Sequence, residues 1–84
     1  MAQIIAVYRG SLGTTIGLRE ERLEAATVSE VLCHIRSSHG KAAHRAARAM
    51  LIVVDGVSIL HKKVFATQLD NGSVVSFLPI AAGG

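Results

Sequence analysis

The last two residues of the sequence, Gly83 and Gly84, are the ones whose type and position most clearly suggest chemistry. Glycine has no Cβ atom, so a narrow channel of another protein can close around this backbone. The terminal carboxylate of Gly84 would then stand unhindered for attack on a phosphate. Residues 80–84, if extended, reach about 17 Å beyond the strand before them. The pattern predicts either a reactive tail that enters a partner's cleft or a frayed chain end without function.

A second group of residues with chemical potential carries positive charge at helical spacing. Lys41, His44, Arg45 and Arg48 occupy positions i, i+3, i+4 and i+7, so a helix would place them on one face. In a chain with a net charge of +3, this face predicts either docking on an acidic partner or a solvated surface. Because no nucleic-acid motif, set of stacking aromatic residues or phosphate-binding loop accompanies it, no nucleic-acid partner is expected.

The single cysteine and the four histidines show no spacing typical of a metal site. Cys33 has no partner for an internal disulfide, which favours a reducing compartment. Helical-wheel counting places its thiol on an exposed face, where it is interpreted as incidental, with a persulfide relay as the alternative. No metal and no permanently bound cofactor are therefore expected. The histidines interpreted as surface or packing residues are His34, His39, His44 and His61.

Length and composition limit the class of protein that this sequence can form. The 84 residues suffice for one domain but are too few for a conventional enzyme with a deep enclosed pocket. Half of the residues are apolar and only 4% are aromatic, so the core must be aliphatic. The longest apolar run, residues 49–54, is far too short to span a membrane, and the N-terminus lacks the charged segment of a signal peptide. The sequence predicts a cytoplasmic protein without membrane association.

The first half of the chain predicts two strands and a helix. Residues 3–8 are β-branched and apolar, as in a buried strand, and the charged residues of 18–25 suggest an exposed second strand. Thr27 and Glu30 form a capping box, which predicts a helix start. Gly40 is placed to end that helix. One apolar stripe follows from the spacing of Val28, Val31, Leu32 and Ile35.

The second half predicts a short helix and three strands. An Ala-rich segment, residues 41–50, forms the short second helix, and residues 51–54 and 57–60 form a hairpin around Asp55-Gly56. A turn at residues 69–72 leads to the last strand, 73–78, which Pro79 ends. Alternation in that strand places Val75 and Phe77 on one face and Val74, Ser76 and Leu78 on the other.

This order of elements predicts an α+β domain. We expect a mixed four- to five-stranded sheet with one main helix packed across it and a short second helix. A β-grasp fold fits the order. Residues 1–79 would form the domain, and residues 80–84 a flexible Gly-Gly tail.

The end of the sequence resembles the C-terminus of the MoaD/ThiS sulfur carriers, which are ubiquitin-like β-grasp proteins. Their signature is a Leu-x-Asp-Gly-Asp-Glu-Val turn and strand followed by Phe-Phe-Pro-Pro-Val-x-Gly-Gly, and residues 69–84 read LDNGSVVSFLPIAAGG. The resemblance extends through the helix start at Thr27 and the Asp55-Gly56 hairpin, so it covers nearly the whole chain. Pro79, six residues from the end, resembles the molybdopterin synthase small subunit more than the thiamine carrier. The acidic pair of the family's turn and its second proline are replaced here, the latter by Ile80.

The resemblance implies that this protein is a carrier and substrate, not an enzyme. A ubiquitin-activating-type adenylating enzyme would use ATP and magnesium to convert the Gly84 carboxylate to an acyl-adenylate, and sulfur from a donor enzyme would displace AMP. The thiocarboxylate would then enter the large subunit of molybdopterin synthase, which builds the dithiolene of molybdopterin. The tail that inserts comprises Ile80, Ala81, Ala82, Gly83 and Gly84. Family members dock through the apolar face of the last strand, which makes Val74, Leu78 and Pro79 the interface candidates, with ordinary packing as the alternative.

Three other functions remain open at this stage. Sulfur carriage for thiamine or another metabolite would use the same chemistry. A ubiquitin-like modifier would also be activated at Gly84 but would end as an isopeptide on substrate lysines. A plain interaction module with an inert tail would not change when Gly83 and Gly84 are deleted.

Overall fold

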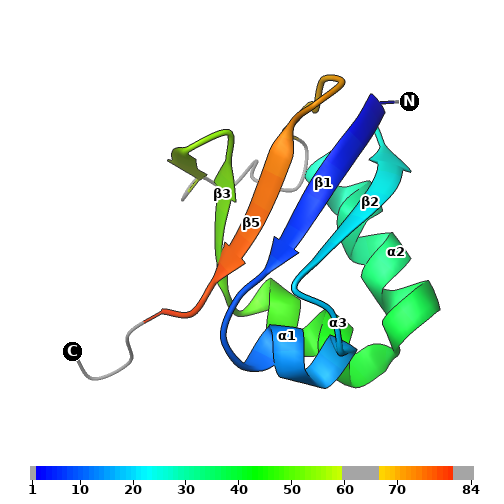
Figure 1. Cartoon of the computed structure of the whole chain (residues 1–84), viewed down its shortest axis with the longest axis vertical. Coiled ribbons are helices and arrows are strands. Elements are labelled where there is room, and N and C mark those ends of the chain that lie inside the picture. Colours follow the sequence, from blue (N-terminus) through cyan, green and yellow to red (C-terminus); the bar gives the residue numbers. More distant parts are fainter. Residues whose placement is uncertain (1, 60–66, 81–84) are drawn as a thin grey trace.

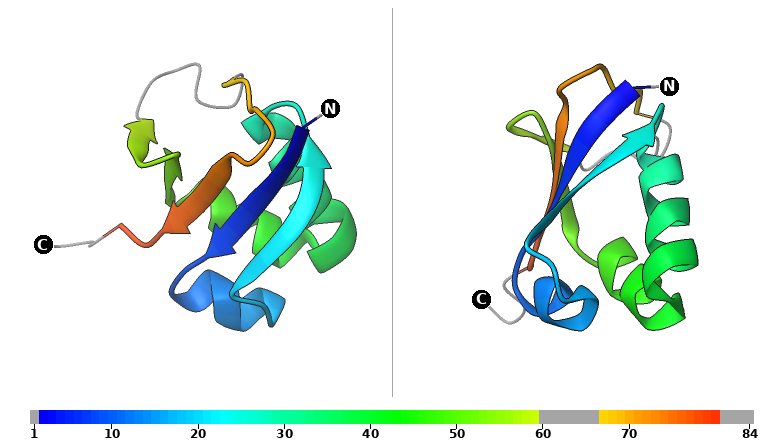
Figure 2. Two further views of the ribbon diagram at one scale, coloured as in Figure 1. Left: turned by 45° about the horizontal axis from the view of Figure 1, so that its top comes forward. Right: turned by 45° about the vertical axis from the view of Figure 1, so that its right-hand side comes forward.

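The computed structural model describes residues 2–59 and 67–80 as a mixed β-sheet with helices on one face (Figures 1 and 2). The strands are β1 (Ala2–Tyr8), β2 (Glu20–Ala25), β3 (Leu51–Val54), β4 (Val57–Ile59) and β5 (Val74–Leu78). The helices are α1 (Ser11–Ile16), α2 (Val28–His39) and α3 (Lys41–Arg48). The five strands lie in the order β2-β1-β5-β3-β4, with β1 and β5 parallel and the other pairs antiparallel. This architecture confirms the predicted α+β class and mixed sheet.

Helix α2 is the main helix across the sheet, and it begins where the capping box predicts. The Thr27 hydroxyl accepts a hydrogen bond from the Glu30 amide at 3.3 Å, and the Glu30 carboxylate accepts one from the Ala26 amide at 2.9 Å. The predicted apolar stripe is buried against the sheet. Gly40 follows the helix with a φ of 96°, a conformation that favours glycine, and separates α2 from α3.

The core lies between the helices and one face of the sheet. In β1, Ile4, Ala6 and Tyr8 are buried toward the helices, and in β5 Val75 and Phe77 are fully buried. This alternation confirms the facing predicted for the last strand. The Tyr8 and Phe77 rings lie with their centroids 6.0 Å apart, so the two parallel strands contribute neighbouring aromatic side chains to the core.

The hairpin between β3 and β4 has the predicted turn. Asp55 and Gly56 have φ values of 51° and 83°, as a type I′ turn requires. Asp55 also binds the start of β5: its amide donates to the Val74 carbonyl at 2.9 Å, and its carboxylate accepts from the Val74 amide at 2.8 Å. The β3–β4 hairpin is therefore hydrogen-bonded to β5, the strand that precedes the tail.

Helix α1 was not predicted from the sequence, which indicated only one main helix and a short second one. The segment SLGTTI contains a glycine and β-branched residues, which are poor helix formers, and its N-cap makes no side-chain hydrogen bond. Tertiary packing overrides this propensity, because Leu12 is fully buried and Gly13 lies against the Tyr8 carbonyl. The second strand, expected from residue 18, consequently begins at Glu20.

The longest helix, α2, has 12 residues. Within residues 2–59 and 67–80, no helix combines the length and apolarity needed to cross a membrane.

Candidate functional site: the open sheet face and the base of the tail

The sheet face opposite the helices carries apolar side chains from its three inner strands, and no described helix or strand covers it (Figure 2). We call it the open sheet face. Its apolar side chains are half-buried. They come from β1, β3 and β5 and comprise Ile5, Val7, Leu51, Val53, Val74 and Leu78. Two of the predicted interface residues, Val74 and Leu78, therefore lie on one continuous surface.

Strand register arranges these side chains in rows across the sheet. Ile5 pairs with Val74, and Leu51 pairs with Leu78. Directly paired residues point to the same face, so each pair forms one apolar row. Ser76 lies between Val7 and Val53 in the row between them. The contributions of β1 and β3 were not predicted from the sequence. The apolar runs at residues 4–8 and 51–54 were the available signal, but such runs predict burial on both faces and not exposure of one.

The tail begins at Ile80, two residues after Leu78, which is the last residue of β5 and a member of this face (Figure 1). Pro79, the third predicted interface residue, is exposed and lies against Gly10, where an added Cβ atom would come within 3.3 Å of the proline Cγ. The Arg9 amide donates to the Phe77 carbonyl at 3.1 Å. The residue after β1 is therefore still hydrogen-bonded to β5 one residue before β5 ends. Ile80 is 61% exposed. The other predicted tail residues, 81–84, lie outside the described residues.

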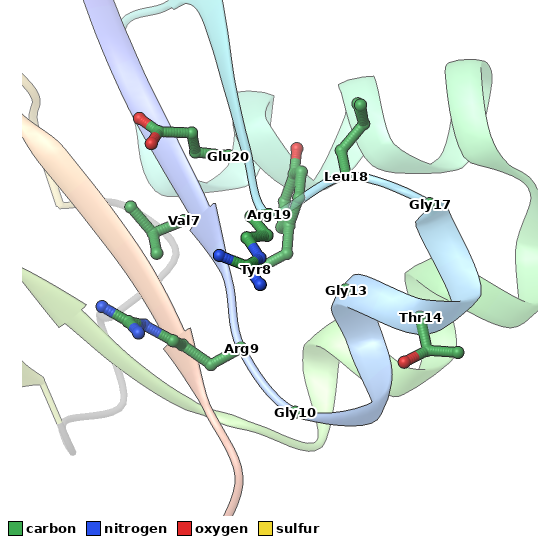
Figure 3. Close-up of a pocket in the computed structure, with 10 residues that line it drawn as sticks. All are labelled: Val7, Tyr8, Arg9, Gly10, Gly13, Thr14, Gly17, Leu18, Arg19 and Glu20. Carbon is green, nitrogen blue, oxygen red and sulfur yellow. The ribbon is translucent and has the colours of Figure 1, made fainter.

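A pocket of about 650 Å³ lies between the end of β1, α1 and the start of β2 (Figure 3). Its polar side chains include the guanidinium groups of Arg9 and Arg19 and the carboxylate of Glu20. Among the described residues of the lining, those with a hydroxyl are Thr14 and Tyr8, and none is a histidine, cysteine or lysine. The described part of the lining therefore offers no nucleophile in contact with a general base.

The predicted positive charges share one surface. They line a groove of about 480 Å³ together with Arg36 from α2 and Ala49, and we call this surface the basic groove. The predicted members are Lys41, His44, Arg45 and Arg48. No carboxylate lines the groove, and its side chains have no ion-pair partner within the part of the chain that the structure describes. The groove is available for an acidic surface of a partner.

The family of this protein follows from its sequence match. The model of the ThiS family matches residues 3–84. The chain belongs to the ThiS family. This confirms the predicted resemblance to the MoaD/ThiS carriers, and hence to a group of small sulfur carriers and ubiquitin-like modifiers. Curated protein sequences give no match to this ThiS-family chain.

Solved structures confirm the ubiquitin-like β-grasp fold of this ThiS-family protein. Small archaeal modifier protein 1 from Methanosarcina acetivorans is similar with a TM-score of 0.84 and 20% identity, covering 100% of this chain and 98% of that one. A putative molybdopterin converting factor subunit 1 from Pyrococcus furiosus is similar with a TM-score of 0.71 and 18% identity over 94% and 98% of the chains. The complex of subunits 1 and 2 of molybdopterin-converting factor from Helicobacter pylori gives a TM-score of 0.68 and 19% identity over 98% and 99%.

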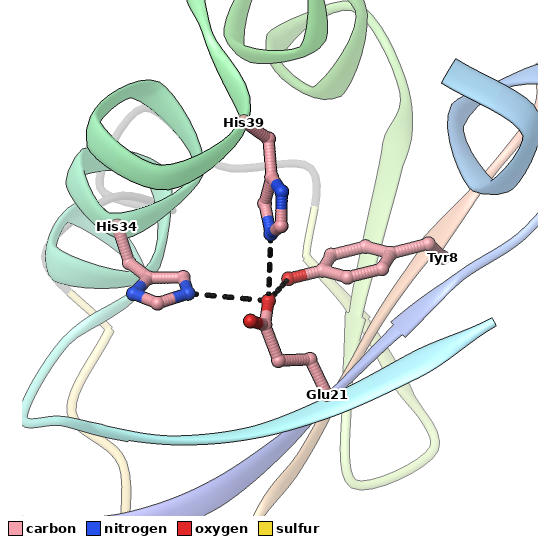
Figure 4. Close-up of polar contacts among 4 residues, drawn as sticks. All are labelled: Tyr8, Glu21, His34 and His39. Carbon is pink, nitrogen blue, oxygen red and sulfur yellow. Dashed lines mark hydrogen bonds and ion pairs between the residues drawn. The ribbon is translucent and has the colours of Figure 1, made fainter. Parts of the chain in front are cut away.

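A polar cluster behind the sheet was not anticipated from the sequence. We call it the Glu21 cluster; its members are Tyr8, Glu21, His34 and His39 (Figure 4). Glu21 Oε1 accepts a hydrogen bond from the Tyr8 hydroxyl at 2.8 Å and lies 3.0 Å from His39 Nε2. His34 Nε2 is 3.1 Å from the same oxygen, but it lies outside hydrogen-bond geometry. The two histidines are thus not separate surface or packing residues, because both converge on one carboxylate oxygen.

Burial and hydrogen bonding shift the pKa of the Glu21 carboxyl group in opposite directions. Partial burial alone would raise the pKa of this carboxyl group. The contacts with His39, Tyr8 and His34 outweigh burial and lower the pKa, so the carboxylate form is favoured. Burial also raises the pKa of the Tyr8 hydroxyl, and the adjacent Glu21 carboxylate raises it further, which keeps Tyr8 a hydrogen-bond donor.

Proposed function

We propose that this protein is a sulfur carrier that receives sulfur as a thiocarboxylate on Gly84 and serves as the small subunit of molybdopterin synthase. The observation that carries the proposal is the continuity between the open sheet face and the base of the tail. A partner that binds the apolar rows of β1, β3 and β5 would also hold the point where residues 80–84 begin. The tail would then be aimed from a fixed origin into that partner's active site.

The chemistry at Gly84 proceeds in two displacements. A carboxylate resists nucleophiles, so it first attacks the α-phosphate of ATP, and an acyl-adenylate forms as pyrophosphate leaves. A sulfur nucleophile such as hydrosulfide then attacks the acyl carbon. AMP leaves with the bonding electron pair, and the thiocarboxylate remains. The adenylating enzyme supplies the magnesium ion that binds ATP, and the carrier contributes an unobstructed C-terminal glycine.

In this proposal, the large subunit of molybdopterin synthase is the enzyme that receives the thiocarboxylate tail. Subunit 1 of the Helicobacter pylori molybdopterin-converting factor, in its complex with subunit 2, shares the fold of this chain. Apolar side chains at the centre of a surface and polar ones at its rim are typical of protein interfaces. The open sheet face has this character, with apolar rows that include Val74 and Leu78 of the middle strand and with Arg9 and Arg22 exposed at neighbouring positions.

We propose a role without catalysis for this chain, as in the small sulfur carriers of the ThiS family to which it belongs. The adenylating, sulfur-donating and sulfur-accepting groups would therefore belong to partner enzymes.

The test of the carrier chemistry is tandem mass spectrometry of the C-terminal peptide. The protein is incubated with a candidate adenylating enzyme, ATP, magnesium and a sulfide source, beside a variant that lacks Gly84. We expect sulfur in place of one oxygen on Gly84. Fragmentation must assign the change to that residue, because oxidation at Met1, Met50 or Cys33 adds nearly the same mass to the whole protein. An unmodified carboxylate beside an adenylating enzyme proven active would contradict the proposal.

The same incubation separates the carrier from a ubiquitin-like modifier. Both would be adenylated at Gly84, but a modifier would form isopeptides between Gly84 and substrate lysines. Trypsin would leave residues 64–84 as the remnant on those lysines, because the last basic residue of the sequence is Lys63. A thiocarboxylate that is consumed without such remnants indicates the carrier. Production of molybdopterin from its precursor by the large subunit then distinguishes this pathway from thiamine or another acceptor.

The docking surface can be tested with charge placed on the open sheet face. Leu78→Glu is expected to weaken binding of the large subunit, because it puts a carboxylate in the centre of an apolar contact. The matched control is Leu18→Glu, since Leu18 is 42% exposed and lies away from this face beside α1. Equal binding by both variants would show that the large subunit docks elsewhere.

A further inference from the structure

The Glu21 cluster contains three groups that commonly bind transition metals: one carboxylate and two imidazoles. They come from different elements, Glu21 from β2 and His34 and His39 from α2. Both Nε2 atoms lie within 3.1 Å of Glu21 Oε1, and one ligand atom from each residue lies within 4.8 Å of the other two. Figure 4 shows both rings presenting this nitrogen to the carboxylate.

These separations suit a tetrahedral ion. Zinc binds imidazole nitrogen and carboxylate oxygen at about 2.0–2.2 Å, which places neighbouring ligand atoms of a tetrahedron about 3.3 Å apart. The two nitrogen-to-oxygen distances, 3.0 and 3.1 Å, are within a few tenths of an ångström of that value. The ring centroids lie 5.8 Å apart at an interplanar angle of 77°, so the imidazoles approach from different directions. Small rotations of the side chains would make room for an ion between the three atoms.

The hydrogen bonding of His34 also points to a missing ligand. Its Nε2 atom is buried, points into the cluster, and has no hydrogen-bond partner within residues 2–59 and 67–80. A buried nitrogen without a partner costs free energy, on the order of 1–3 kcal/mol, unless something occupies its lone pair or accepts its proton. A metal ion would bind this nitrogen directly, whereas its 3.1 Å contact with Glu21 Oε1 does not meet hydrogen-bond geometry.

Tyr8 supplies the hydrogen bond that would orient Glu21 as a metal ligand. Its hydroxyl holds Glu21 Oε1 at 2.8 Å from inside the core, where Tyr8 is only 2% exposed. Hydrogen bonds of this kind orient metal ligands and contribute to affinity. The side chains of His34, Glu21 and His39 are 30%, 21% and 14% exposed, so an ion can reach the cluster from solvent.

We propose that Glu21, His34 and His39 bind a divalent transition-metal ion of the zinc type, with Tyr8 orienting the carboxylate and a water molecule completing the tetrahedron. Two imidazoles and one carboxylate, with an open fourth position, form a ligand set that zinc uses in proteins. The site would join β2 to the end of α2. It is separate from the sulfur chemistry of the tail and does not depend on it.

The test uses Co²⁺ as a spectroscopic probe and Zn²⁺ as a competitor, with the full chain free of any affinity tag. We expect one Co²⁺ per chain, with the intense visible absorption of tetrahedral cobalt, displaced by one equivalent of Zn²⁺. His34→Ala and His39→Ala should each weaken Zn²⁺ binding by at least about tenfold, since they remove a ligand. The matched controls are His44→Ala, a histidine of α3 outside the cluster, and Cys33→Ser, an exposed thiol beside His34; both should bind as the natural sequence does.

A measurement on the unsubstituted protein keeps the proposal falsifiable where a variant does not fold. Nitrogen-15 correlation spectra of the histidine rings should show Zn²⁺-dependent shifts at Nε2 of His34 and His39 and none at His44. Failure of the natural sequence to bind one Co²⁺ per chain would overturn the proposal. So would binding that is equally tight in the folded His34→Ala/His39→Ala variant, or ring shifts confined to other histidines.

Discussion

Replacing Gly13 by alanine tests whether close packing, and not helix propensity, determines the structure of α1. In an ordinary helix this change is stabilising, by about 1 kcal/mol, because alanine is the better helix former. Here an added Cβ atom would stand 2.8 Å from the Tyr8 carbonyl oxygen and 3.3 Å from that of Leu18. Both are backbone atoms that cannot rotate away, so α1 or the end of β1 must move.

The two effects oppose each other, and their magnitudes decide the sign. Overpacking in a well-packed region costs about 1–3 kcal/mol, and a contact with two backbone oxygens lies toward the upper end of that range. After the gain in helix propensity is subtracted, we expect Gly13→Ala to lower the free energy of unfolding by about 1–2 kcal/mol. In a domain of this size, that loss lowers the melting temperature by about 5–15 °C.

Thermal unfolding followed by far-UV circular dichroism measures this difference. The matched control is Thr14→Ala, an exposed position in the same helix, which should change the stability by no more than about 0.5 kcal/mol. If Gly13→Ala melts at or above the temperature of the natural sequence, the close approach to Tyr8 is not what requires glycine, and the account of α1 given above is wrong.

Three further predictions concern the cap, the Glu21 cluster and the basic groove. Thr27→Ala should lower the free energy of unfolding by about 1 kcal/mol in urea denaturation, since it removes the acceptor for the Glu30 amide; a loss no greater than that of the exposed Ser29→Ala would contradict this. Tyr8→Phe should cost about 1–2 kcal/mol in the same assay, because the Glu21 carboxylate loses its buried donor; unchanged stability would show that water replaces the hydroxyl without cost. Joint substitution of the two arginines of α3 by alanine should reduce the salt dependence of binding to an acidic partner, measured by calorimetry at several salt concentrations; an unchanged affinity and salt slope would exclude the basic groove from docking.

Sequence patterns correctly predicted the helix start and the hairpin turn, which depend on interactions between residues that are close in the sequence. The capping box at Thr27 and the Asp55-Gly56 turn each form within a few neighbouring residues, and both were confirmed. Helix α1 could not be predicted in this way. Its local propensity is poor, and the burial of Leu12 against distant residues is what stabilises it.

The same distinction explains what was missed at the candidate sites. His34 and His39 are five positions apart, about 140° around a helix, and no rule of helical spacing pairs them. They converge because His39 is the last residue of α2 and because β2 places Glu21 between them. The basic groove was predictable, since all four of its predicted members lie on one short helix. For residues 81–84 the reactive tail stays a prediction.

The position of β5 has a mechanical consequence for any process that draws on the tail. β5 lies between two neighbours, parallel to β1 and antiparallel to β3, and Asp55 binds its first residue. A force on the C-terminal end along β5 therefore shears the hydrogen bonds to β1 and to β3 at the same time. At a sheet edge, by contrast, a force across the strand can break the hydrogen bonds one after another. We expect the domain to withstand a larger force from this end than from β2, which single-molecule pulling can compare. A partner could thus grip and withdraw the last residues repeatedly while the domain that carries them stays folded.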